Sequence, residues 1–343
     1  MTMTETRPSV DVHAEFSSTV ERRLMVFGGR ANPGLAAEIG KQLGAGLSPV
    51  QLKTFSGGEV YCRYQESIRG ADVFIIQPMC ANAETGMGTN DSLLELLVMI
   101  DAAVGASAHR VIAVTPWFGY SRQDKKSSPR EPISARLVAR MLESAGADRV
   151  LTMDLHAGQI QGMFQIPLDH MTASMALAQH FIDLNLQEEM VVVSPDVGRV
   201  KLSKTFADRI GASLAILDKS RPEQQAAQVE HLIGNVAGKV AIIVDDIIDT
   251  AGTLCAAAHA VMREGATRVF AAATHPVFSG RAYENLANSP LEQVVVTDTI
   301  PLRPGAPDNI HVVSCAGLLT DSISRIFTCG SVSDVFGGYN QMF

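Results

Sequence analysis

The sequence predicts an α/β protein made of two tandem domains, each a mostly parallel sheet flanked by helices. Short apolar runs alternate with amphipathic stretches, a pattern typical of strands buried on both faces and the helices that cover them. The chain also repeats itself: residues 105–116 (GASAHRVIAVTP) and 265–276 (GATRVFAAATHP) each read as a helix end, a turn and a strand. This echo favours two similar domains, although such units also recur within one doubly wound sheet.

The predicted elements begin at 22–29 (RRLMVFGG), a short strand that is closed by glycines. Short apolar runs predict further strands at 72–77, 111–115, 150–153, 190–193, 214–217, 240–244, 269–273 and 294–297. Apolar residues at helical spacing predict helices at 35–43, 93–104, 134–145, 174–184, 200–210, 252–264 and 280–286.

The order of these elements also predicts where the domains begin and end. Residues 1–22 lack periodicity and are expected to form a disordered leader. The first domain is expected to cover 23–171, completed by 314–328, and the second to cover 172–313, completed by 329–343.

Composition excludes several classes of protein. The formal net charge of −8 opposes bulk binding to nucleic acid or to anionic membrane surfaces. No apolar stretch reaches the roughly 18–20 residues of a membrane span, and the first twenty residues lack the apolar core of a signal peptide. The five scattered cysteines form no C-x-x-C pair, which indicates free thiols in a reducing compartment. A cytoplasmic location is therefore expected, with no membrane or nucleic-acid partner.

Negative charge gathers at the end of one predicted strand. Residues 244–253 read VDDIIDTAGT, so Asp245 and Asp246 are expected at the exit of the strand 240–244. Residues 250–253 (TAGT) then open a helix, whose backbone N–H groups suit a phosphate. Adjacent carboxylates suit the vicinal hydroxyls of a sugar or a divalent metal. A helix cap beside surface acids is the alternative, but the combination favours a pocket for a sugar phosphate.

Other predicted strands also end in polar residues. His156 and Asp196 each follow a strand, and together they could ligate a magnesium ion that keeps several waters. Lys219 and Arg221 follow a third strand, in a polar loop that could close over a polyphosphate. The basic residues of a further loop could receive phosphates; they are Arg122, Lys125, Lys126 and Arg130. Taken singly, a structural histidine, a turn aspartate and solvated basic loops are the alternatives.

Together, these segments resemble the ribose-phosphate pyrophosphokinase (phosphoribosyl pyrophosphate synthetase) family, from about residue 24 to residue 336. The matching stretches are ESIRG (66–70), SRQD (121–124), REPISA (130–135), DLHAGQIQGMF (154–164), SPDVG (194–198), DDIIDTAGT (245–253), ATHPVFSG (273–280) and SVSDVF (331–336). The loop DDIIDTAGT alone would indicate only the wider phosphoribosyltransferase superfamily. Both domains are expected to have the phosphoribosyltransferase-like fold.

The resemblance implies an enzyme that transfers the diphosphoryl group of Mg-ATP to the C1 hydroxyl of ribose 5-phosphate. The products are AMP and phosphoribosyl pyrophosphate, which feeds nucleotide biosynthesis. The ribose 5-phosphate site would comprise Asp245, Asp246, Asp249, Thr250, Ala251, Gly252 and Thr253. His156 and Asp196 match the positions that hold Mg²⁺, and the catalytic residues would be Lys219, Arg221 and His156.

The resemblance also implies contacts with ATP and between subunits. The ATP site would comprise Phe55, Glu59, Arg122, Gln123, Lys125 and His156. Of these, Phe55 and Glu59 lie on an adenine-binding loop that reaches in from a neighbouring subunit, so a homohexamer built from dimers is expected. Possible allosteric residues are Ser67, Arg69, Ser331 and Ser333.

Some positions depart from the family pattern. Gly57 replaces an aspartate of the adenine loop, and Ser128 replaces an arginine linked to phosphate activation and ADP inhibition. Ser220 separates the two cations of the catalytic loop. After Asp196 the family usually has a second glycine and a nearby arginine, where this chain has Arg199 and Leu202.

Two other functions compete with an active diphosphokinase. A non-catalytic regulatory homologue that assembles with an active synthetase would be expected to lose Lys219, Arg221, His156 or the aspartates, and this chain keeps them. A phosphoribosyltransferase that consumes the product would need one phosphoribosyl loop, but neither the duplicated architecture nor the catalytic loop.

Overall fold

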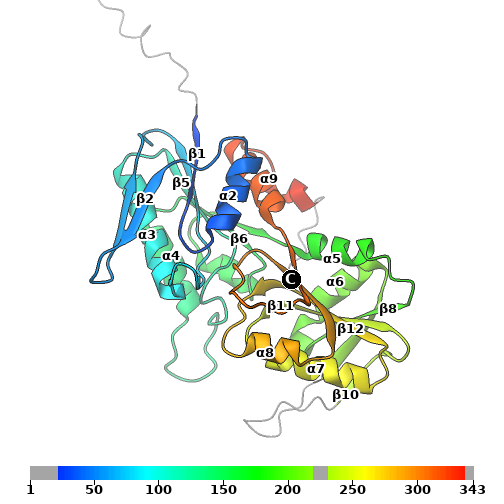
Figure 1. Ribbon diagram of the computed structural model, residues 1–343. Coiled ribbons are helices and arrows are strands. Elements are labelled where there is room, and N and C mark those ends of the chain that lie inside the picture. The colour runs from blue at the N-terminus through cyan, green and yellow to red at the C-terminus, as the bar shows by residue number, and fades with distance from the viewer. Residues whose placement is uncertain (1–21, 219–230, 337–343) are drawn as a thin grey trace, which may run out of the picture.

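The computed structural model describes residues 22–218 and 231–336, which form two lobes side by side (Figure 1). One lobe is built on a five-stranded sheet and the other on a seven-stranded sheet. Helices cover both faces of each sheet. The predicted α/β fold with mostly parallel sheets is confirmed.

The five-stranded sheet is parallel throughout. In spatial order its strands are β1 (Leu24–Gly28), β4 (Asp72–Ile76), β5 (Arg110–Thr115), β6 (Arg149–Met153) and β7 (Leu168–Met171). One face is covered by α3 (Thr89–Gly105) and α4 (Ser134–Ala145), and the other by α2 (Pro33–Gln42) and α9 (Ala316–Phe327). Because neighbouring residues of a strand face opposite sides, Ile75 packs under α3 and α4 while Phe74 packs under α2 and α9. Burial on both faces explains why these strands read as continuous apolar runs.

The seven-stranded sheet is parallel except at one edge, where β10 runs antiparallel to β9. In spatial order its strands are β10 (His231–Ile233), β9 (Ser213–Asp218), β8 (Met190–Ser194), β11 (Val240–Ile248), β12 (Arg268–Pro276), β13 (Leu291–Thr297) and β14 (Ile310–Val313). One face is covered by α5 (Ser174–Asp183) and α6 (Val200–Ile210), and the other by α7 (Gly252–Arg263) and α8 (Ala282–Ala287).

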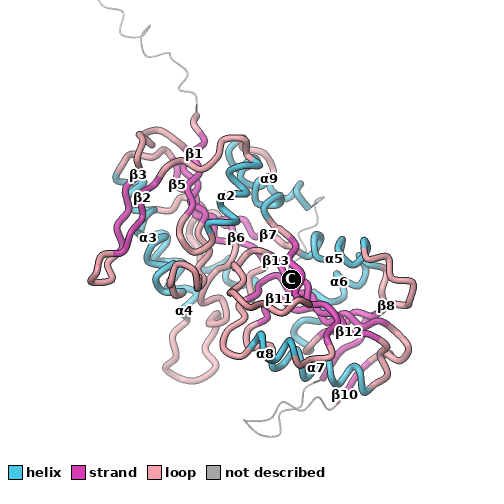
Figure 2. Tube along the Cα trace, in the orientation of Figure 1, coloured by secondary structure: helices cyan, strands magenta, loops and turns pink. Residues whose placement is uncertain are grey.

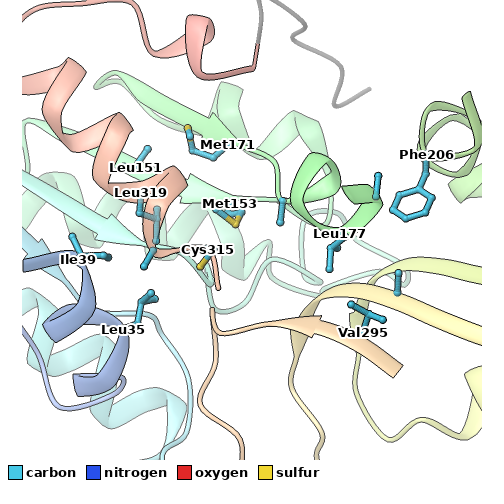
Figure 3. Close-up of a cluster of buried hydrophobic side chains, with 14 of the residues drawn as sticks. Leu35, Ile39, Leu151, Met153, Met171, Leu177, Phe206, Val295, Cys315 and Leu319 are labelled. Carbon is cyan, nitrogen blue, oxygen red and sulfur yellow. The ribbon is translucent and has the colours of Figure 1, made fainter. Parts of the chain in front are cut away.

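One hydrophobic cluster extends through both lobes (Figure 3). It includes Leu35 of α2 and Leu319 of α9, passes Met153 at the end of β6, and reaches Leu177 of α5 and Phe206 of α6. The helix α9 follows the second lobe in the sequence, yet it packs against α2 of the first lobe (Figure 1). The two lobes therefore share part of their core.

A separate antiparallel hairpin projects from the first lobe (Figure 2). It consists of β2 (Val50–Thr54) and β3 (Val60–Tyr64). Its base is fixed by Tyr64, whose hydroxyl donates to the Met99 carbonyl at 2.7 Å and whose ring packs 4.6 Å from that of Phe27. Its tip, residues 55–59, is exposed.

The structure corrects several predicted elements. The prediction omits the short strands β2, β3, β7, β10 and β14, and the helix α9. It also ends β11 at Val244, whereas the strand continues to Ile248 because its ladder with β12 extends to the pair Ile248–Pro276. The domain boundaries remain a prediction. All five cysteines are free, as predicted. In the described ranges, no helix is long and apolar enough to cross a membrane.

Candidate functional site

A cavity of about 220 Å³ lies where the carboxyl end of β11 meets the first lobe. The sequence-predicted residues that line it are Arg122, His156, Asp196, Asp245, Asp246, Asp249, Thr250, Ala251 and Thr253. They come from four separate segments of the sequence and from both lobes. All four segments meet in this cavity.

Asp245 and Asp246 lie inside β11, not at its exit as the sequence predicts. Burial in the cleft and the neighbouring Asp246 carboxylate raise the pKa of Asp245 well above its ordinary value. Burial alone would also raise the pKa of Asp246, but a hydrogen bond with His156 and the charge of Arg199 lower it below the usual range. The pKa values of the two neighbouring carboxyl groups are therefore displaced in opposite directions, and Asp246 is the more readily ionised.

Arg199 is a residue for which the sequence predicts no role. Its Nη2 lies 2.9 Å from Asp246 Oδ1, and its Nε lies 3.5 Å from Asp245 Oδ1. The same Nη2 lies 2.7 Å from Nδ1 of His156, and Nη1 donates to the His156 carbonyl at 3.2 Å. The only signal in the sequence is that an arginine stands where the related family has a glycine.

His156 joins the two lobes through the same carboxylate. It follows β6 of the first lobe, and its Nδ1 lies 2.8 Å from Asp246 Oδ2 in the second. A carboxylate in this position orients the imidazole ring, as it does for histidines that ligate metals through the other nitrogen.

Asp249 begins the loop that leads from β11 into α7. Its two oxygens accept hydrogen bonds from Ser279 Oγ and from Arg122 Nη1. Burial opposes ionisation of Asp249, but these two hydrogen bonds prevail and lower its pKa. The Arg122 contact links the basic loop of the first lobe directly to the site in the second.

Thr250, Ala251 and Thr253, at the junction of this loop with α7, also line the cavity. Asn285 Nδ2 donates to the Thr250 carbonyl at 2.8 Å and holds the loop in place. Ala251 has φ of 61°, a left-handed conformation that costs a residue other than glycine roughly 1–2 kcal/mol. No side chain caps α7, so the N–H groups of its first turn are available to an anion.

Asp196 lies at the start of a single turn of 3-10 helix, Val197–Arg199, at the end of β8. Its Oδ1 accepts from the backbone N–H groups of Gly198 at 2.8 Å and Arg199 at 3.1 Å. Among the described residues, no group of three His, Cys, Asp or Glu side chains is arranged to hold a metal ion. The donors at this site nevertheless suit Mg²⁺, which takes one or two carboxylates and completes its shell with waters and substrate phosphates.

Several predicted ATP-site residues lie outside the cavity. Gln123 faces α4, where its Oε1 accepts from Ser134 Oγ. Lys125 is exposed on the basic loop. Phe55 and Glu59 lie on the hairpin tip, far from β11 in Figure 1, and Phe55 is 45% exposed. The structure does not bring these four residues to the site of the same chain.

The remaining predicted residues fall elsewhere. Lys219 and Arg221 lie outside the described residues. Ser331 and Ser333 contact each other at 2.8 Å between their hydroxyls, on the exposed end of the second described range. Ser67 and Arg69 are exposed in the loop before β4, where the Ser67 carbonyl accepts from Arg23 at 2.6 Å.

A buried polar network fixes the two lobes beside this cavity. Asp154 accepts from the backbone N–H of Ala173 at 2.9 Å and from Thr274 Oγ1 at 2.6 Å. His275 is fully buried and lies 3.1 Å from the Met153 carbonyl, and burial lowers its pKa. These contacts join the end of β6 in the first sheet to the end of β12 in the second, beside the place where His156 meets Asp246.

The chain is similar to known proteins over most of its length. The family model described as the N-terminal domain of ribose phosphate pyrophosphokinase matches residues 24–146, and that of the phosphoribosyl synthetase-associated domain matches residues 220–337. The ribose-phosphate pyrophosphokinase of Caldanaerobacter subterraneus subsp. tengcongensis is 50% identical over 314 residues, covering 91% of this chain and 98% of the relative. That of Chromobacterium violaceum is 50% identical over 318 residues, covering 91% and 94%. The crystal structure of phosphoribosylpyrophosphate synthetase from Mycobacterium smegmatis superimposes with a TM-score of 0.83 at 41% identity, covering 90% of this chain and all of that one.

Proposed function

This chain belongs to the ribose-phosphate pyrophosphokinase family, and we propose that its active site is the cavity at the carboxyl end of β11. The enzyme transfers the diphosphoryl group of ATP to the C1 hydroxyl of ribose 5-phosphate, giving phosphoribosyl pyrophosphate and AMP. The similarity extends over nearly the whole length of these relatives, which favours an active enzyme over a non-catalytic regulatory subunit.

In the proposed site, ribose 5-phosphate lies across β11 and the start of α7. The uncapped N–H groups and hydroxyls of residues 250–253 would bind the 5-phosphate. Asp245, Asp246 and Asp249 would accept hydrogen bonds from the ribose hydroxyls. The support for this placement is that all three carboxylates and the loop line one cavity.

The proposed cofactor is Mg²⁺, held by His156 and Asp196 and completed by waters and ATP phosphates. When bound, it would neutralise phosphate charge during the transfer. Asp246 would orient His156 from the opposite side of its ring, at the 2.8 Å contact with Nδ1.

The chemistry is an in-line displacement at the β-phosphorus of ATP. The C1 hydroxyl oxygen forms a bond to this phosphorus as the bond to the oxygen shared with the α-phosphate breaks, and AMP leaves. Such transfers require positioning and charge neutralisation more than covalent help from the protein. Lys219 and Arg221, which lie outside the described residues, are proposed to neutralise the charge that develops on the diphosphoryl group.

ATP is proposed to bind along the basic loop of the first lobe, with Arg122 nearest the transferred group. Gln123 and Lys125 would need to turn inward from their present positions. Phe55 and Glu59 would contact the adenine of a neighbouring subunit, within a homohexamer built from dimers. The exposed, projecting hairpin tip supports this arrangement, since it lies free of its own site. A cytoplasmic location is part of the same proposal.

A single observation carries the assignment of the site: Arg122 and His156 of the first lobe contact Asp249 and Asp246 of the second inside one cavity. The direct test is release of AMP from ATP in the presence of Mg²⁺, with and without ribose 5-phosphate. AMP that forms only with ribose 5-phosphate supports the proposal, and its absence from an Asp246→Asn, Asp249→Asn double variant would tie the activity to this cavity. The same assay is repeated over a range of inorganic phosphate concentrations. If no AMP is released at any of them in the presence of ATP, Mg²⁺ and ribose 5-phosphate, the protein would instead be the non-catalytic homologue.

A further inference from the structure

Among the described residues of the second lobe, Arg199 is the one arginine that lines the proposed active site. Its side chain is only 18% exposed and contacts both β11 carboxylates and His156. Asp245 and Asp246 are proposed to bind the ribose, and His156 is proposed to bind the metal. The guanidinium therefore supplies the positive charge beside these three groups in the free enzyme.

The contacts of His156 Nδ1 cannot both be hydrogen bonds at the same time. Nδ1 lies 2.8 Å from a carboxylate oxygen of Asp246 and 2.7 Å from Nη2 of Arg199. The carboxylate can only accept a hydrogen bond, whereas the guanidinium can only donate one. A single ring nitrogen cannot satisfy both, so the Arg199 contact must open whenever His156 donates to Asp246.

Electrostatics favours the same movement when a metal binds. A divalent cation held by His156 and Asp196 would lie beside Asp245 and Asp246 in the same cavity, where a guanidinium already neutralises these carboxylates. Like charges at such separations repel strongly in a partly buried site, so cation and guanidinium compete for the pair. The phosphates of ATP would arrive in the same cavity and offer the displaced guanidinium new acceptors with suitable bidentate geometry.

The surroundings leave room for this movement. A second cavity of about 350 Å³ adjoins the first and shares with it His156, Arg199, Asp245 and Asp246. Arg199 thus lines both cavities.

We propose that Arg199 exchanges partners when substrates bind. In the free enzyme it neutralises Asp245 and Asp246; on binding of the metal and nucleotide it releases them to the cation and turns to the phosphates. Arg199 therefore weakens the binding of a divalent cation alone and strengthens the binding of the nucleotide. This inference rests on the proposed function, because it takes His156 and Asp196 as the metal site that the β11 carboxylates adjoin.

The test measures binding rather than turnover. Mn²⁺ alone would be titrated by electron paramagnetic resonance, and α,β-methylene-ATP alone by calorimetry in the presence of a chelator. For Arg199→Gln we expect Mn²⁺ to bind about tenfold more tightly than to the wild type, and the nucleotide about tenfold more weakly. Arg199→Lys keeps the charge without the planar fork, so both shifts should be smaller and of the same sign.

The matched control is Lys204→Gln, which removes the same charge from an exposed position of α6 that lines neither cavity. It should change neither affinity. Equal Mn²⁺ affinities for the wild type and Arg199→Gln would overturn the inference, as would an unchanged nucleotide affinity. An Asp196→Asn variant distinguishes a failure of the proposed metal site from a failure of the proposed role of Arg199. If it retains full Mn²⁺ binding, the proposed metal site is wrong and the inference fails with it; if it loses Mn²⁺ binding while Arg199→Gln is silent, only the inference fails.

Discussion

Arg122 allows the structural and the ligand-binding contributions of one side chain to be separated. Its contact with Asp249 joins two side chains that are 49% and 29% exposed. Ion pairs this accessible contribute about 0–1 kcal/mol to stability. Arg122→Ala should therefore lower the free energy of unfolding by less than about 1 kcal/mol, because the rest of the interface between the lobes is buried and does not involve it.

The effect on ATP should be larger. If Arg122 leaves Asp249 to bind a phosphate, the substitution removes a hydrogen bond to a charged group, which is worth about 1.5–3 kcal/mol. Since 1.4 kcal/mol corresponds to a factor of ten, the affinity for ATP should fall about tenfold to 150-fold. Ribose 5-phosphate affinity should change less, because Ser279 continues to hold Asp249.

Both quantities can be measured on the same preparation. Binding of α,β-methylene-ATP with Mg²⁺ is followed by calorimetry, and urea unfolding by the fluorescence of the single tryptophan, Trp117, which is buried 4.7 Å from His275 near the junction of the lobes. Arg281→Ala is the control, since it removes an exposed arginine paired only with Glu284 on the described surface. A large loss of stability with unchanged ATP affinity would refute the reasoning and make Arg122 a structural residue.

Three further predictions concern catalysis, sugar binding and stability. Lys219→Ala or Arg221→Ala should lower turnover on the order of 100–1000-fold in a steady-state assay of AMP release, with calorimetric affinity for ribose 5-phosphate nearly unchanged; wild-type turnover would contradict their role. Asp245→Asn combined with Asp246→Asn should weaken ribose 5-phosphate binding, and an unchanged dissociation constant would count against the sugar site. Asp72 is the fully buried first residue of β4, and although burial alone would raise its pKa, hydrogen bonds from a neighbouring arginine and histidine lower it. Its stabilising contribution is therefore present above the unfolded-state pKa of about 3.9 and is lost as pH falls through the lower folded-state value. Asp72→Asn should cost about 3 kcal/mol at pH 7 and remove that part of the acid dependence in urea unfolding; identical pH profiles would contradict this.

The core of each sheet could be predicted from the sequence because both faces of its strands are covered. Strands such as β4 and β5 are apolar at nearly every position, so the local sequence identifies them without any knowledge of which strands they pair with. The omitted strands have weaker patterns. In β14, for example, the two middle residues are exposed, and its pairing with β13 is decided by tertiary contacts that no local pattern reveals.

The loops that form the candidate site could be predicted from the sequence, but the contacts between them could not. The sequence places Asp245, Asp246 and the following loop at one end of a strand, and the structure brings His156 to them from the other lobe. That meeting depends on the packing of two sheets, which sequence spacing cannot give. For Arg199, the sequence shows only a departure from the family pattern. Its contacts with Asp246 and His156 become apparent only in the three-dimensional structure.

The packing of α9 against α2 has a consequence for how the protein is made. The ribosome synthesises α2 among the first elements and α9 among the last, so Leu35 and Ile39 lack part of their covering until almost the entire chain has emerged. Many multidomain proteins fold domain by domain during translation, but the first lobe here cannot be completed in that way. Closing contacts between such distant segments is slow, and the apolar face of α2 stays open to chaperones meanwhile. A chain that ends before residue 316 would lack α9, which covers one face of the five-stranded sheet and contributes to the core shared by the two lobes.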